Sequence, residues 1–372
     1  MGEWEGTVED VVTPLPLFDL SSHYRGRRVL VTGHTGFKGT WLAAWLAEMG
    51  AEVTGFSLAP EDSPSLFDLA KLDLAADVRG DVRDAALLER VFESSQPQIV
   101  FHMAAQPLVR RSYRDPLFTF STNLMGTVNL LEACRRAPEL RAVVVVTTDK
   151  VYENKEWVWG YREDEPLGGR DPYSASKACA EIATAAFRRS YFGEKGAPAI
   201  ASARAGNVIG GGDFCEDRIV PDIVRGIADG RPAVIRNPDA TRPWQHVLDA
   251  LSGYLLLAKR LEEDPTRFAA AWNFGPDEAA SVPVSELATK LLARLGRGEI
   301  SISTRDPSAP HEARALRLDT SKARALLGWQ PRLSFDAAIE LVADFYGRFL
   351  ADPADVPVTL RGQIAAYERW GA

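Results

Sequence analysis

The segment that decides the fold reads Arg28-Val29-Leu30-Val31-Thr32-Gly33-His34-Thr35-Gly36-Phe37-Lys38-Gly39. Its apolar first half stops at a glycine turn, which is typical of a buried parallel strand. After the turn, large apolar side chains recur every four residues on one helical face, at Phe37, Trp41, Trp45 and Met49, and Gly50 ends the pattern. The segment therefore predicts a strand, a glycine turn and a helix in succession.

A glycine turn between a strand and a helix can hold the phosphates of a dinucleotide. Glycines let the backbone approach the pyrophosphate, and the helix N-terminus offers unpaired N–H groups. The cofactor-binding residues expected in this turn are Gly33, Thr35, Gly36, Phe37 and Gly39.

Two further positions bear on the cofactor. Asp81 and Val82 follow the second expected strand and are candidates to hold an adenine amine. The alternative is that Asp81 caps a helix that begins near Asp84. Ser57 and Leu58 stand where a ribose-binding acid is usual, and no arginine follows directly to take a 2′-phosphate. This pattern favours NAD over NADP.

Apolar runs and helical patterns alternate through the first half of the chain with short connections between them. The expected strands are 28–32, 52–56, 98–103, 141–147 and 199–205, and the expected helices are 84–94, 116–135 and 173–192. This alternation predicts an α/β fold with a doubly wound parallel sheet, a Rossmann arrangement.

The pattern changes after Asn207, where glycines and prolines interrupt short mixed elements. We expect a loose N-terminal extension (1–24), a dinucleotide-binding domain (25–206), a smaller mixed α/β substrate lobe (207–345) and a C-terminal tail (346–372). Some elements of the lobe are expected to return to the first domain. The region from residue 318 to the end is expected to be helical, with a break at 328–331.

Composition narrows the class of protein. The chain has 372 residues, of which 46% are hydrophobic and 25% charged, as in an ordinary globular protein. Its net charge of -8 disfavours nonspecific nucleic-acid binding. Three cysteines and five histidines show no disulfide or metal-ligand spacing, so no metal is expected. No apolar run is long enough for a membrane span, and the acidic start is unlike a signal peptide, which predicts a cytoplasmic enzyme with no membrane contact.

Two clusters carry the candidate chemistry. Tyr173 and Lys177 are four residues apart and share one face of the expected helix. A phenol is a poor base at neutral pH, but a neighbouring ammonium and a positively charged nicotinamide ring would lower its pKa, so that it can take a proton from an alcohol. Thr148, Asp149 and Lys150 directly follow the valine-rich strand and can move further protons. Together the clusters indicate a redox enzyme that does more than redox.

These motifs carry a resemblance to the extended short-chain dehydrogenase/reductase family of NAD-dependent epimerases and dehydratases, over about residues 25–345. The matching segments are 31–39, 102–110, 121–123, 149–150, 156–163, 204–213 and 242–247. The similarity is greatest to the branch that dehydrates CDP-glucose. The related dTDP-glucose dehydratases carry Asp-Glu where this chain has Asp149-Lys150, and UDP-galactose epimerases usually have neither acidic group.

The resemblance implies a reaction and roles for the two clusters. The substrate is CDP-glucose, the cofactor is NAD, and the product is CDP-4-keto-6-deoxyglucose, which feeds deoxysugar synthesis for surface polysaccharide. Tyr173 takes the proton of the 4-hydroxyl, Lys177 holds the nicotinamide ribose, and Thr148 bonds the 4-oxygen. Asp149 protonates the departing 6-hydroxyl. Lys150 stands where relatives place the C5 base, or it stabilises an enolate electrostatically.

The resemblance also implies binding residues and an assembly. The further cofactor-binding residues are Ala104, Ala105 and Asn123, and the substrate-binding residues are Gln106, Asn207, Arg218, Arg236 and Arg242. Solvated surface positions are the alternative for the three arginines. His311 and Glu312 match the family without an assigned role. A homodimer through helices 116–135 and 173–192, or a tetramer, is implied.

Two other functions stay open from the sequence. One is a 4,6-dehydratase or 4-epimerase that acts on another nucleotide sugar. The other is a non-catalytic NAD-binding regulator with the same fold, which the presence of both Tyr173 and Lys177 disfavours.

Overall fold

The computed structural model describes residues 18–193, 196–277, 280–303 and 316–370. Its centre is a seven-stranded sheet in the order β11-β6-β5-β4-β1-β2-β3, with every neighbouring pair parallel. The strands are β1 (Arg28–Thr32), β2 (Glu52–Ser57), β3 (Ala76–Arg79), β4 (Ile99–His102), β5 (Ala142–Val146), β6 (Ala199–Ala205) and β11 (Ala271–Phe274). The chain order reverses between β1 and β4, which is where open α/β sheets bind ligands.

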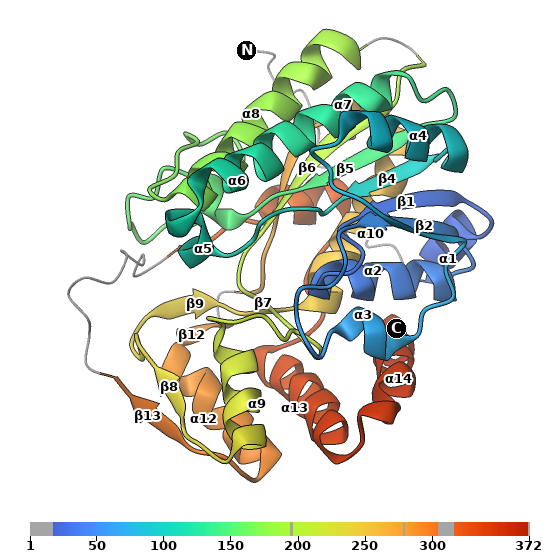
Figure 1. Ribbon diagram of the computed structural model, residues 1–372. Coiled ribbons are helices and arrows are strands. Elements are labelled where there is room, and N and C mark those ends of the chain that lie inside the picture. The colour runs from blue at the N-terminus through green and yellow to red at the C-terminus, as the bar shows by residue number, and fades with distance from the viewer. Residues whose placement is uncertain (1–17, 194–195, 278–279, 304–315, 371–372) are drawn as a thin grey trace.

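Helices cover both faces of this sheet, which confirms the predicted doubly wound fold (Figure 1). One layer holds α4 (Ala85–Ser95), α6 (Pro116–Phe120), α7 (Gly126–Arg135) and α8 (Pro172–Tyr191), and the other holds α2 (Phe37–Glu48) and α10 (Val247–Glu263). The side chains of β5 alternate between the two sides. Ala142, Val144 and Val146 pack into one core cluster, and Val143 and Val145 pack into the other.

The expected helix 116–135 is continuous but contains a π-helical turn, η2 (Ser121–Met125), between α6 and α7. Asn123 lies inside this turn and its side chain bonds to the backbone of Gln106 and to Ser176. Such bulges occur frequently at functional sites. Here the turn joins the helix to the loop that follows β4.

A smaller lobe lies below the sheet in Figure 1. It contains β7 (Val208–Ile209), α9 (Ile219–Asp229), β8 (Ala233–Ile235), β9 (Thr241–Pro243), β10 (Gln245–His246), β12 (Ser281–Pro283), α12 (Val284–Leu295) and β13 (Ile300–Ile302). Its strands form the two-stranded sheets β10-β7, β12-β9 and β13-β8. Between these elements along the chain, α10 packs against the large sheet and β11 is one of its strands. The other described elements are α3 (Leu66–Ala70), α5 (Val109–Arg114), η3 (Asp149–Val151), α11 (Pro265–Phe268), η5 (Ala323–Leu327) and η6 (Pro353–Asp355).

The N-terminal segment is not loose as far as Tyr24, which corrects one prediction. Residues Phe18–Tyr24 form helix α1, and Leu20 and Tyr24 are fully buried. The Tyr24 hydroxyl donates to the Leu255 carbonyl at 2.7 Å, which ties α1 to α10. The rest of the expected extension, and His311 and Glu312, lie outside the described residues.

The C-terminal segment is helical as predicted, but the boundary expected at residue 345 falls inside α13 (Phe335–Ala351). The next helix, α14 (Val356–Glu368), packs against α2. Trp45 donates to the Glu368 carboxylate at 2.8 Å and meets the Tyr367 ring edge-on. The final helix is therefore part of the wall that covers the sheet. Among the described residues, no helix is long and apolar enough to cross a membrane.

Candidate active site

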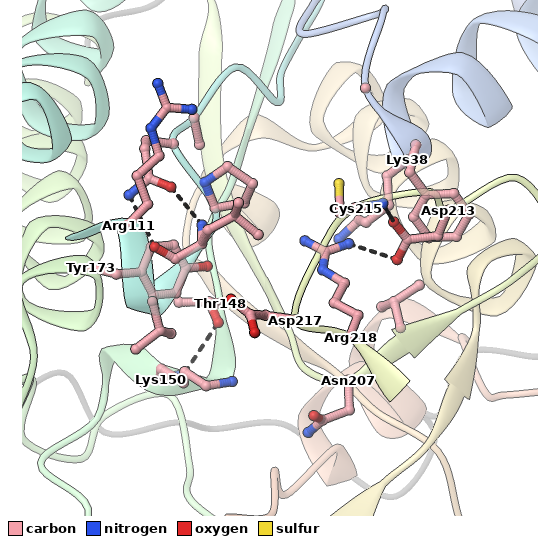
Figure 2. A pocket seen from close by; sticks show the side chains of 18 of the residues that line it. Lys38, Arg111, Thr148, Lys150, Tyr173, Asn207, Asp213, Cys215, Asp217 and Arg218 are labelled. Atoms are coloured by element: carbon pink, nitrogen blue, oxygen red, sulfur yellow. Dashed lines mark hydrogen bonds and ion pairs between the residues drawn. The ribbon is translucent and has the colours of Figure 1, made fainter. Parts of the chain in front are cut away.

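A cavity of about 1030 Å³ lies where the strands of the large sheet end and the small lobe begins. Figure 2 shows its two sides: Tyr173, Thr148 and Lys150 come from the sheet domain, and Arg218 and Asn207 come from the segment that leads into the lobe. The structure thus brings both predicted catalytic clusters into one cavity with the predicted substrate arginines.

The glycine turn is built as a dinucleotide site requires. Gly33 has a φ of +75°, and a Cβ there would lie 2.7 Å from the Ala104 nitrogen. A Cβ at Gly39 would lie 2.0 Å from the Gly33 carbonyl oxygen. Gly36 precedes α2 and has no side chain to cap it, so the first N–H groups of the helix remain available to an anion. Phe37 completes the predicted set, and all five of these residues border the cavity.

The end of β2 and the residues after β3 form the next part of the wall. The Thr35 hydroxyl hydrogen-bonds to the Ser57 hydroxyl at 2.9 Å and to the Leu58 carbonyl at 3.0 Å. Asp81 and Val82 line the cavity, and the Arg83 guanidinium that binds Asp81 holds the pKa of that carboxyl below its usual value.

The capping role that was the alternative for Asp81 belongs to another residue. Asp84 precedes α4, and its carboxylate accepts from the Leu87 N–H at 2.9 Å. Asp81 therefore remains a candidate for the adenine end of a dinucleotide.

The residues predicted to bind the cofactor in and near the loop after β4 have different surroundings. Ala104 and Ala105 border the cavity as expected. Asn123 is buried, and its amide holds both the backbone N–H and the carbonyl of Gln106 and the hydroxyl of Ser176. Its amide is thus already occupied in shaping the loop, and we correct its assignment from a cofactor ligand to a scaffold residue.

Gln106 also needs correction, although it borders the cavity. Its side-chain amide donates to the Leu108 carbonyl and the Thr119 hydroxyl, and its oxygen accepts from the Leu108 N–H at 2.6 Å. These bonds engage the amide with its own loop and with α6, which argues against the predicted substrate contact by this side chain.

The acid–base cluster sits on the turn η3. Thr148 caps the turn by accepting from the Lys150 N–H, and its hydroxyl donates to Asp149 Oδ1 at 2.9 Å. Lys150 Nζ lies 3.6 Å from the same oxygen, and its side chain is 36% exposed. Asp149 is buried, and its second oxygen, Oδ2, has no hydrogen-bond partner within the described part of the chain. A Cβ at Gly206 would lie 2.0 Å from Oδ2, so only glycine leaves room for this carboxylate.

Helix α8 presents the predicted pair. Asp171 caps the helix through the Ser174 N–H, and Pro172 occupies its first position. Lys177 is buried and donates to the Val146 carbonyl at 2.8 Å. Burial lowers the pKa of Lys177 to about 8, and the Glu181 carboxylate opposes this shift.

Burial and neighbouring charge act on the pKa of Tyr173 in opposite directions. Burial raises it above the ordinary value, and the charge of Lys150 and the hydrogen bond with Thr148 only partly oppose this effect. The expected lowering relied on Lys177 and on a charged nicotinamide ring. In the protein alone, desolvation of the phenolate outweighs the neighbouring cations.

The predicted substrate arginines are held by acids that border the same cavity. Arg218 pairs with Asp213 at 2.8 Å and Arg236 with Asp217 at 2.7 Å. Arg242 lines the cavity on β9. Asn207 also lines it, with a φ of 20°. All four residues border the cavity, and the side chains of Arg218 and Arg236 are 34% and 36% exposed, so solvent also reaches them.

Sequence reasoning missed several charged groups in this cavity. Arg110 approaches Asp217 at 3.7 Å, so Asp217 lies between two arginines. Lys38 donates to the Tyr254 hydroxyl at 3.1 Å, and burial together with Lys177 and Arg218 lowers its pKa to about 7. Both residues lie in motifs that the sequence does single out. Their places in the cavity depend on contacts with residues far away in the sequence, Asp217 for Arg110 and Tyr254 for Lys38.

Comparisons with known proteins agree with this geometry. The family model described as GDP-mannose 4,6 dehydratase matches residues 30–342. The CDP-glucose 4,6-dehydratase of Salmonella typhimurium (strain LT2) is 50% identical over 349 residues, which cover 92% of this chain and 97% of that protein. The dTDP-glucose 4,6-dehydratase of Xanthomonas campestris pv. campestris (strain B100) is 29% identical over 336 residues, or 85% and 92% of the two chains.

Among solved structures, DesIV of Streptomyces venezuelae, a dTDP-glucose 4,6-dehydratase crystallised with NAD, matches with a TM-score of 0.74 at 25% identity, covering 88% of this chain and 99% of that one. The parallel sheet with helices on both faces is thus a fold shared with a nucleotide-sugar dehydratase. Because the family match spans most of the chain and a relative at 50% identity covers nearly all of it, the chain belongs to the GDP-mannose 4,6 dehydratase family of extended short-chain dehydrogenase/reductases.

Proposed function

We propose that this protein is an NAD-dependent dehydratase that converts CDP-glucose into CDP-4-keto-6-deoxyglucose and water. The observation that carries the proposal is the meeting of two catalytic sets in one cavity: Tyr173 with Lys177, and Asp149 with Lys150. A simple dehydrogenase needs only the first set. The 50% identity to the Salmonella typhimurium enzyme named for CDP-glucose supports the choice of substrate.

The residues around the glycine turn fit NAD. Gly33 and Gly39 let the backbone of the turn pack more closely than any Cβ would allow, and the start of α2 after Gly36, which no side chain caps, offers its N–H groups to a diphosphate. Thr35 and Phe37 shape the turn, and Asp81, Val82, Ala104 and Ala105 border the adenine and ribose side. When bound, NAD+ supplies the acceptor that takes hydride from C4 and later returns it to C6.

The chain's own groups move the protons. Tyr173 takes the proton of the sugar 4-hydroxyl, and Thr148, which hydrogen-bonds to Tyr173, holds the 4-oxygen. Lys177 holds the nicotinamide ribose and adds positive charge beside the phenol. The resulting 4-ketone makes the C5 proton acidic. Asp149 then protonates the departing 6-hydroxyl, and Lys150 acts at C5, either as the base or by stabilising the enolate.

The nucleotide diphosphate has a matching set of cations. Arg218, Arg236 and Arg242 line the lobe side of the cavity, and a guanidinium fork suits phosphate oxygens. Asn207 adds an amide at the same side. The acids Asp213 and Asp217 hold two of these arginines in place in the protein alone.

The proposal includes an assembly and a location. Leu117, Met125, Ile182 and Tyr191 are exposed on α6, η2 and α8, which supports a homodimer, or a tetramer built from such dimers, through these helices. We place the enzyme in the cytoplasm, where it supplies a deoxysugar precursor of surface polysaccharide.

The reaction itself gives the first test. CDP-glucose with a catalytic amount of NAD+ is expected to yield a product lighter by one water, without net accumulation of NADH. The measurement is product mass alongside NADH absorbance, with UDP-, dTDP- and GDP-glucose in parallel. NADH formed in proportion to substrate, or an isomer of unchanged mass, would contradict dehydration. Faster turnover of another donor would change the assigned nucleotide.

The packing of Gly206 gives a second test. A methyl group at this position meets Asp149 Oδ2 at 2.0 Å, so Gly206→Ala must displace the carboxylate. A shift of about 1 Å can cost roughly 10²-fold in rate, and we expect a loss of that order in dehydration. Gly362→Ala on α14 is the matched control, because a Cβ there meets nothing within 4 Å. Wild-type turnover in Gly206→Ala would show that Asp149 does not need its present position.

A further inference from the structure

A buried ion pair lies behind the acid–base cluster and takes no part in the proposed proton transfers. Arg204 on β6 and Glu181 on α8 meet at 2.9 Å, and both side chains are 3% exposed. The Glu181 carboxylate also accepts from the Thr147 hydroxyl at 2.5 Å and from the Ser202 hydroxyl at 2.7 Å. All three residues that donate to this carboxylate are buried, so it is bonded to the protein interior.

The other side of the pair reaches the far end of the same catalytic segment. Arg204 donates to the Tyr152 hydroxyl at 2.7 Å and to the Glu163 carbonyl at 3.1 Å. Tyr152 in turn donates to the Asn273 side-chain oxygen at 2.7 Å. The guanidinium also lies over the Tyr152 ring, 4.9 Å from its centroid. The ion pair thus hydrogen-bonds to Thr147 through Glu181 and to Tyr152 through Arg204. These two residues flank the segment Thr148–Lys150.

The same pair is linked to the redox residues through α8. Tyr173, Lys177 and Glu181 are spaced four residues apart, so they follow one face of this helix. Lys177 points its ammonium at the Val146 carbonyl, at the end of the strand that leads into Thr147. The helix face that carries the redox pair therefore also carries the anchor of the acid–base segment.

We propose that Glu181 and Arg204 are positioning residues that hold the Thr148–Lys150 segment in register with Tyr173 and Lys177. The inference rests on the proposed dehydratase function. That reaction uses Tyr173 and Thr148 at C4, and Asp149 and Lys150 across C5 and C6. A displaced segment leaves Tyr173, the base of the oxidation, in place on α8 but misplaces both groups of the elimination, so the elimination slows more than the oxidation. A buried ion pair is weak evidence for stability as such, because proteins in which apolar residues replace such a pair are often equally stable. Apolar side chains would not, however, make the hydrogen bonds that fix the position of residues 148–150 relative to Tyr173 and Lys177.

The cleanest test cuts one link and leaves the ion pair intact. Thr147→Val removes the hydroxyl that Glu181 accepts but keeps the side-chain shape, whereas Thr147→Ser keeps the hydroxyl. We expect Thr147→Val to slow water loss by roughly 10²-fold, the effect of a misplacement of about 1 Å, while oxidation at C4 slows much less. Reduced dinucleotide should then accumulate on the enzyme, and Thr147→Ser should restore the wild-type ratio of the two rates.

A second pair of variants separates register from stability. Glu181→Gln leaves Arg204 buried without a counter-ion, so we expect a lower folding stability. We also expect the rate of water loss to fall relative to the rate of oxidation at C4. The double variant Glu181→Gln with Arg204→Met removes the unpaired charge, and we expect it to regain thermal stability but keep the slow elimination. Asp249→Asn is the matched control: this buried carboxylate on α10 accepts from Tyr367 and from the Arg332 N–H, away from the cavity. It should lower thermal stability and leave the ratio of rates unchanged.

The measurements are absorbance of the reduced dinucleotide, release of the dehydrated sugar by mass, and the thermal midpoint of each variant. Equal slowing of both steps in Thr147→Val, or recovery of the elimination together with stability in the double variant, would overturn the inference while leaving the dehydratase assignment intact. A wild-type protein that forms no dehydrated product would overturn the proposed function and this inference with it.

Discussion

Tyr173→Phe is expected to stop the reaction before the dinucleotide is reduced, whereas Asp149→Asn should stop it afterwards. The phenylalanine lacks the oxygen that takes the 4-hydroxyl proton, so oxidation at C4 has no base. The asparagine removes only the acid that protonates the 6-hydroxyl. General acid–base catalysis contributes roughly 10²- to 10⁴-fold, so both variants should lose at least 10²-fold in dehydrated product. The measurement is a single-turnover experiment with bound NAD+ that follows reduced dinucleotide and product mass together.

The structure supports this division of labour. Tyr173 lies on α8 and Asp149 on η3, with its Oδ2 against Gly206, so the two proposed roles belong to separately held groups. Tyr191→Phe, at the exposed end of the same helix α8, is the control and should keep full activity. If Asp149→Asn also fails to form reduced dinucleotide, Asp149 is needed in the first step and the assignment is wrong.

Much of the sheet could be predicted from sequence because its signals are local. The apolar run before Gly33 and the valine run of β5 are buried on both faces, so each reads as a continuous apolar segment. The packing of α1 and α14 could not be predicted in the same way. Their places depend on contacts such as Tyr24 with Leu255 and Trp45 with Glu368, which join residues more than two hundred positions apart.

In the candidate site, too, features set by local sequence could be predicted and features set by distant contacts could not. Tyr173 and Lys177 are recognisable because helical spacing fixes their common face. By contrast, Asn123 is an amide in a matching motif, and only the structure shows that its hydrogen bonds are taken by Gln106 and Ser176. The pKa of Tyr173 depends on desolvation as well as on neighbouring charge, and the amount of burial is a property of the assembled cavity.

Lys150 is expected to be essential for elimination whichever role it has at C5. Its ammonium nitrogen lies 3.6 Å from Asp149 Oδ1, and its charge also acts on Tyr173. Lys150→Met keeps most of the side-chain length but removes the nitrogen. We expect dehydration and the exchange of the C5 proton with solvent to fall together by at least about 10²-fold. Lys290→Met is the control and should cost little, because it breaks two exposed ion pairs, one with Glu286 on α12 and one with Asp336 on α13.

Lys150→Glu then distinguishes the two roles. A carboxylate can accept the C5 proton but cannot stabilise a negative enolate, so substantial recovery relative to Lys150→Met identifies residue 150 as the base. The new carboxylate would also stand beside Asp149, and neighbouring like charges raise the pKa of one of the pair, which suits Asp149 as the proton donor. No recovery, with the C5 proton still retained, identifies the ammonium as the group that stabilises the enolate. Near-normal turnover of Lys150→Met, with solvent deuterium still entering C5, would show that Lys150 has neither role and that the proton is taken by another group in the cavity.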